Sequence, residues 1–134
     1  MQLPHGATVA VADGEKLNLF RNTGDETHPK LTALPSPTID SDSRGTATGH
    51  RSSAANPDND QQEEDGHTAG VAAMLNQAVL SGKIQALLVI AAPRTLGELR
   101  KHYHQKLSAV LIGELSKDLT GHSLAEVEKA IAAA

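Results

Sequence analysis

Alternating small and branched apolar residues near the amino terminus predict a β-hairpin. Residues 7–13 read ATVAVAD, and the Asp-Gly step that ends this run is a strong short-range turn signal. A second apolar run over residues 16–21 follows the turn. The two runs are therefore expected to pair as antiparallel strands.

A third short strand is predicted over residues 30–34, and the two prolines that follow restrict it to an edge or an end of a sheet. From residue 36 to residue 65 the chain is dominated by Ser, Asp, Gly, Asn, Gln and Pro. A segment of this composition has few side chains that can enter a core. We therefore predict a flexible loop insertion over residues 36–65.

Helical spacing of apolar residues predicts two helices, with a buried strand between them. Apolar positions recur at helical spacing from His67 to Leu80, where Ser-Gly ends the pattern. The continuous apolar run from Ile84 to Ala92 is typical of a strand buried on both faces. Thr95 and Glu98 then have the spacing of a capping box, and the helical face continues to Leu107.

The last third of the chain contains an ambiguous apolar segment and a terminal helix. Residues 108–118 permit either a helix extension or a strand, and we favour a strand from Val110 to Ser116 because Gly113 weakens a helix. Ser123 and Glu126 form a second capping box before an amphipathic stripe. The predicted fold is α/β: a mixed sheet of about five strands packed with three helices.

Length and composition predict one soluble domain. The chain has 134 residues, which suits a single core over residues 1–134. Aromatic residues make up only 1% and cysteine is absent, so we expect modest stability and no disulfide. No run is apolar enough for a membrane span or a signal peptide, which favours a cytoplasmic protein. Because large side chains are few, the protein could gain by dimerising, and we expect a monomer or a weak homodimer.

The corner between the buried strand and the second helix is a candidate anion-binding site, because helix starts at strand ends often bind phosphate or carboxylate. Its candidate residues are Arg94, Thr95, Arg100 and Lys101. The competing interpretation is structural, with Arg94 packing along the sheet and Thr95 only capping the helix. Asp13 and Asp118 are expected to meet these cations if the strand ends converge.

Neither a metal site nor a cofactor is predicted. His102 and His104 point apart on a helix, so they suit solvent exposure better than a shared ion, and the other histidines are expected at the surface. The acidic run over residues 60–65 is interpreted as a solvated segment that favours the positive end of the next helix. No nucleophile stands beside a base, which argues against an esterase-like hydrolase.

Several motifs resemble the bacterial family known as host attachment proteins. The resemblance rests on VAVADGEKLNLF, on Thr27 to Pro29, and above all on AAPRTLGELR followed by SKDLT. That family is similar to the middle domain of archaeal and eukaryotic class-1 peptide-chain release factors. The resemblance implies a mixed α/β sheet with one long loop before the first main helix.

In those release factors the long loop carries a Gly-Gly-Gln motif that promotes hydrolysis of peptidyl-tRNA. This motif is absent here, although the corresponding region keeps glycines and basic residues suited to contacting phosphate. They are Arg44, Gly45, Gly49, His50 and Arg51. The resemblance therefore implies RNA contact without the release reaction.

These observations lead to two functional hypotheses. The first is a non-catalytic release-factor-like domain that associates with the ribosome, tRNA or another RNA, in translation quality control. The alternative is a protein-interaction module involved in bacterial attachment to host cells. The net charge of −4 gives no general attraction to nucleic acid, so RNA contact would have to be local.

Overall fold

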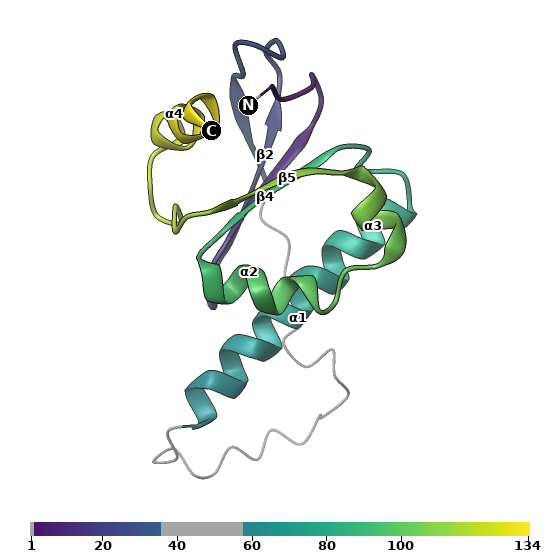
Figure 1. Cartoon of the computed structure of the whole chain (residues 1–134), viewed down its shortest axis with the longest axis vertical. Helices are drawn as coiled ribbons and strands as arrows, with labels where there is room; N and C mark the ends of the chain where they lie inside the picture. The colour runs from purple at the N-terminus through teal and green to yellow at the C-terminus, as the bar shows by residue number, and fades with distance from the viewer. Residues whose placement is uncertain (1, 36–57) are drawn as a thin grey trace.

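A five-stranded mixed sheet forms the centre of the protein (Figure 1). In the computed structural model, which describes residues 2–35 and 58–134 and the side chains of these except 58–64, the spatial order is β3-β2-β1-β4-β5. β1, β4 and β5 run parallel, whereas β2 and β3 are antiparallel to their neighbours. The strands are β1 (Thr8–Ala12), β2 (Leu17–Asn22), β3 (Leu31–Leu34), β4 (Leu87–Ala91) and β5 (Leu111–Ser116).

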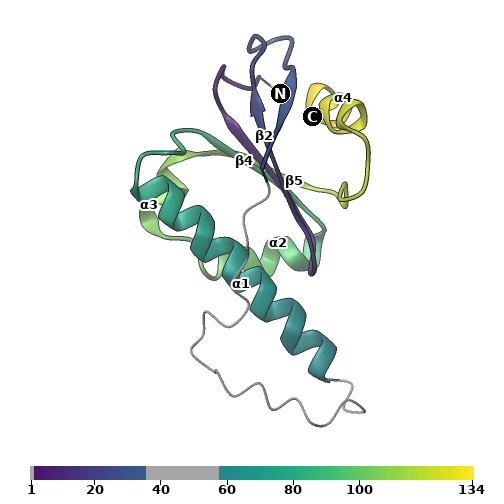
Figure 2. The same cartoon turned by 180° about the vertical axis from the view of Figure 1, so that it is seen from behind.

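Helices cover both faces of the sheet, as Figures 1 and 2 show from opposite sides. Residues of α1, α2 and α3 pack on one face, and α4 packs on the other. The helices are α1 (Asp58–Leu80), α2 (Pro93–Arg100), α3 (Gln105–Val110) and α4 (Leu124–Ala133). None of these helices, within the described part of the chain, is long and apolar enough to cross a bilayer.

The two central strands are buried along their whole length, which explains their continuous apolar sequence. Alternate side chains enter different cores: Ala10 and Val89 pack with α1, whereas Val9 and Leu88 pack on the opposite side with α4. The predicted mixed α/β sheet is thus confirmed, with its third strand at one edge and its last strand at the other.

The second predicted helix is in fact two helices, so the described chain has four helices and not three. α2 ends at Arg100, and α3 begins after His104, whose Nδ1 accepts a hydrogen bond from the amide of Lys106. Asn76 of α1 holds the turn between them: its side chain donates to the carbonyl of His102 and accepts from the amide of His104, both within 2.9 Å. Tyr103 and Leu107 continue the helical spacing of apolar residues across this break, so the spacing alone does not reveal it.

The first helix begins earlier than its apolar spacing predicts, at Asp58 instead of His67. Its amino-terminal turns extend beyond the sheet (Figure 1). Periodicity therefore detects only the part of α1 that covers the sheet.

Candidate functional site

The carboxyl ends of the three parallel strands meet at one edge of the sheet, which is where open α/β sheets commonly bind ligands. Asp13 follows β1, Pro93 opens α2 directly after β4, and the segment that leads to Thr120 follows β5. These positions are far apart in the sequence. The parallel register brings them to the same edge.

The start of α2 differs from its predicted form. The helix begins at Pro93 with Ala92 as its N-cap, and no side-chain hydrogen bond caps it, so the predicted Thr95 and Glu98 capping box is wrong. Proline suits the first helical position because its fixed φ is helical and it has no amide to leave unpaired. Thr95 instead lies inside the first turn, and the amides of this turn have no side-chain cap.

Arg94 and Lys101 line a surface hollow of about 500 Å³ beside this helix start. Lys101 forms an ion pair with Glu98 at 3.4 Å, whereas Arg94 is exposed and has no ion pair within the described residues. Asp65 also lines the hollow, so its charge is mixed. The guanidinium of Arg94 is the cation here that remains available to an external anion.

Gly97 forms part of the same hollow and leaves its floor open. A Cβ atom built at Gly97 would meet no heavy atom within 4 Å. No close backbone approach therefore requires glycine at this position. A Cβ atom added at Gly97 would project into open space without a clash.

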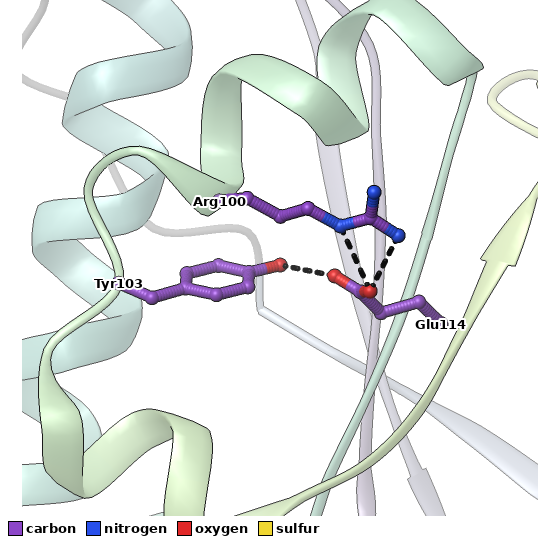
Figure 3. Close-up of polar contacts among 3 residues, drawn as sticks. All are labelled: Arg100, Tyr103 and Glu114. Atoms are coloured by element: carbon purple, nitrogen blue, oxygen red, sulfur yellow. Dashed lines mark hydrogen bonds and ion pairs between the residues drawn. The ribbon is translucent and has the colours of Figure 1, made fainter.

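Arg100 lies about one helical turn after Gly97, and its guanidinium is already hydrogen-bonded to Glu114 (Figure 3). Its Nε and Nη2 donate to the same oxygen of Glu114 at 3.0 and 2.7 Å, and the hydroxyl of Tyr103 donates to the other oxygen at 3.2 Å. Glu114 is on β5, so the contact ties the end of α2 to the edge of the sheet. Burial raises the pKa of Tyr103, and the neighbouring Glu114 carboxylate raises it further.

Asp13 and Asp118 converge on the hydroxyl of Thr120, and not on the arginines as the sequence suggested. The Thr120 oxygen is 2.7 Å from Asp13 and 2.9 Å from Asp118. Since a hydroxyl has one proton, it can donate to only one carboxylate at a time. These hydrogen bonds join the β1–β2 turn to the segment after β5, at the carboxyl ends of the parallel strands.

The electrostatics of Asp13 make it a poor general base. Burial raises its pKa, but hydrogen bonds from Thr120 and from the backbone amides of Glu15 and Lys16, with His67 nearby, more than offset this, and the net pKa is lowered. A carboxylate with a lowered pKa holds a proton weakly. Within the described residues, no group of three side chains is arranged to hold a metal ion.

His67 is a further polar residue near Asp13, at the carboxyl ends of the parallel strands. It was expected at the surface, but it is half-buried, and its Nε2 is enclosed with no hydrogen-bond partner among the described residues. His67 precedes Val71 by four positions, so it lies on the apolar stripe of α1 that faces the sheet. This spacing of four residues is the sequence feature that indicates partial burial of His67.

Comparison with known families supports the relationship that the motifs suggested. The model of one family, bacterial archaeo-eukaryotic release factor family 12, matches residues 6–131. The chain belongs to this family. No match was found among curated proteins.

Membership of family 12 confirms the release-factor relationship, and the sheet agrees with the fold expected from it. The name of host attachment protein is not confirmed. The basic and glycine residues predicted to contact RNA between β3 and α1 lie outside the described residues. They are Arg44, Gly45, Gly49, His50 and Arg51.

Proposed function

We propose that this member of family 12 is a non-catalytic release-factor-like domain that associates with RNA, on the ribosome or on tRNA, in translation quality control. The observation that carries the proposal is the exposed guanidinium of Arg94 beside the uncapped start of α2. Arginine and helix-start amides both favour phosphate oxygens. This corner also lies at the edge of the sheet where ligands commonly bind.

Three observations support the non-catalytic part of this proposal. Gly-Gly-Gln does not occur in the sequence. At the strand edge, the lowered pKa of Asp13 makes this carboxylate a weak base. The hydroxyl of Thr120 is engaged by carboxylates and is not paired with a stronger base. These groups suit structure better than ester hydrolysis.

RNA contact in an acidic protein requires a local positive surface. Arg94 of α2 and Lys101, which follows this helix, supply two cations, and Arg44 and Arg51 supply two from the sequence between β3 and α1. Contacts between cations and phosphates release counterions, so the affinity should fall steeply as the salt concentration rises. An affinity that depended on apolar contacts would change little with the salt concentration.

Co-sedimentation with ribosomes at low and moderate salt tests this proposal. We expect binding by the wild-type protein, loss in the Arg94→Ala/Lys101→Ala variant, and loss in the Arg44→Ala/Arg51→Ala variant. Lys30→Ala/Lys129→Ala is the matched control, because it removes two exposed cations away from the corner. Absence of wild-type binding, or equal loss in all three variants, would contradict the proposal.

The alternative role in attachment is supported by one feature, the open edge at β5. Ile112 is displaced at a register shift in this edge strand and is 39% exposed. An exposed edge can accept a strand from a protein partner. An attachment role requires the protein at the cell surface, so fractionation and protease treatment of intact cells distinguish it from an RNA-associated role.

A further inference from the structure

A groove beside α1, on the face of the sheet that this helix covers, shares no lining residue with the hollow at the start of α2. It has a volume of about 620 Å³, which is within the range of small-molecule sites. One wall is the carboxyl-terminal half of α1 with the loop that follows it, and the other is formed by β1, β2 and β3. α1 packs over the central strands, and among the described residues the groove lies beside this helix.

The groove is apolar at one end. Leu19 and Leu34 are paired across β2 and β3, so their side chains lie next to each other on the face that α1 covers. Met74 of α1 lines the groove opposite them. Its flexible thioether can adapt to ligands of different shape.

The other end of the groove carries positive charge. Arg21 is two residues beyond Leu19 on β2 and pairs with Thr8 at the start of β1. Lys83 lies in the loop that joins α1 to β4, and this loop reaches the sheet at the same end. Both cations are exposed and neither has an ion pair within the described residues. The charge and the apolar surface are thus separated along the groove.

We propose that this groove binds a small amphipathic anion, with its apolar body over Leu19, Leu34 and Met74 and its anionic head at Arg21 and Lys83. Two unpaired cations at one end complement an anionic head group. The apolar end shields a hydrocarbon chain or ring from water. A neutral ligand of the same shape would form no ion pair with either cation and should bind more weakly.

Decanoate and decanol are suitable probes, because they share an apolar chain and differ in the charge of the head group. Binding is measured by displacement of anilinonaphthalene sulfonate fluorescence and by amide chemical shifts. We expect decanoate to bind at one saturable site, to shift the amides of Leu19 and Lys83, and to bind more tightly than decanol.

Arg21→Ala/Lys83→Ala should weaken decanoate binding about tenfold or more, since charge-assisted contacts are lost. Lys16→Ala/Lys30→Ala removes two exposed cations that do not line the groove and should leave the affinity unchanged. Leu34→Glu, which adds a negative charge at the apolar end, should abolish binding while circular dichroism reports an unchanged fold. Equal affinity of decanoate and decanol, or shifts confined to residues outside the groove, would overturn the proposal.

Discussion

Arg100 and Glu114 form an ion pair that joins the end of α2 to the edge strand β5, with both guanidinium contacts on one carboxylate oxygen (Figure 3). The carboxylate oxygen that remains accepts from Tyr103. Arg100 is exposed, whereas the side chain of Glu114 is largely covered. The pair therefore fixes the edge strand β5 against the end of α2. Because its guanidinium is already paired, Arg100 differs from Arg94, which remains available to an external anion.

Tyr103 is the one tyrosine in the chain and reports on this contact without interference. Its titration, followed by absorbance at 295 nm, should lie above the ordinary value of about 10. Glu114→Gln should lower the pKa, because a carboxylate disfavours the phenolate, while the remaining burial keeps it raised. Arg100→Ala should raise it further, since the guanidinium favours the phenolate.

This shift has a consequence for stability at high pH. A folded-state pKa above the unfolded value contributes stability that is complete below the unfolded pKa and is lost as the pH rises above it. The free energy of unfolding should therefore fall above about pH 10, and less steeply in Tyr103→Phe. An unshifted tyrosine titration would contradict the geometry at Glu114.

Asp13 should contribute to stability in the opposite pH range. Its pKa is lowered in the folded state, so its contribution is present above the unfolded value of about 3.9 and is lost as the pH falls through the folded pKa. Asn retains an acceptor for the turn amides but carries no charge, so Asp13→Asn should flatten the loss of stability in acid. Urea unfolding between pH 2 and pH 6 measures the change, with the exposed Asp25→Asn as the control. Equal acid profiles for the wild type and Asp13→Asn would contradict this role.

Gly97 is a position where a larger residue should stabilise the protein. The space around it is open and it lies inside α2, so Gly97→Ala should raise the free energy of unfolding by up to about 1 kcal/mol. Gly82→Ala provides the contrast, because Gly82 has a φ of 81° and alanine should cost about 1 kcal/mol there. Thermal unfolding of both variants tests the pair, and a destabilising Gly97→Ala would show that the helix does not extend through this position.

Asn76 should be important for stability although it is polar and lies on a helix. It both donates to and accepts from the turn between α2 and α3. Asn76→Ala removes both hydrogen bonds and should lower the free energy of unfolding by about 1–2 kcal/mol. Gln77→Ala, at the next and exposed position of α1, is the control. A loss of the same size in both variants would contradict a specific role for these hydrogen bonds, because alanine favours the helix at either position.

The sequence predicted those parts of the fold that depend on local apolar pattern. The hairpin around Asp13, the buried strand β4 and the terminal helix α4 each have a strong local signal, and the structure confirms them. Residues 108–118 were ambiguous because two spacings fit equally. The predicted strand was nevertheless found there, from Leu111 to Ser116.

Long-range polar contacts could not be predicted in the same way. Asp13 and Thr120 are separated by 107 positions, and only the parallel register brings them together. The break after α2 depends on Asn76, a residue of a different helix. The start of α2 was misassigned because Pro93 and Thr95 both satisfy rules for helix starts, and the proline prevails.

Amide chemical-shift mapping with a ribosomal RNA fragment is the decisive test of RNA association, because it reports the surface that contacts RNA. We expect concerted, salt-sensitive shifts at Arg94 to Lys101 and at Arg44 to Arg51, and loss of both sets in Arg94→Ala/Lys101→Ala. The absence of shifts at saturating RNA, or shifts confined to the β3 edge and α4, would contradict it.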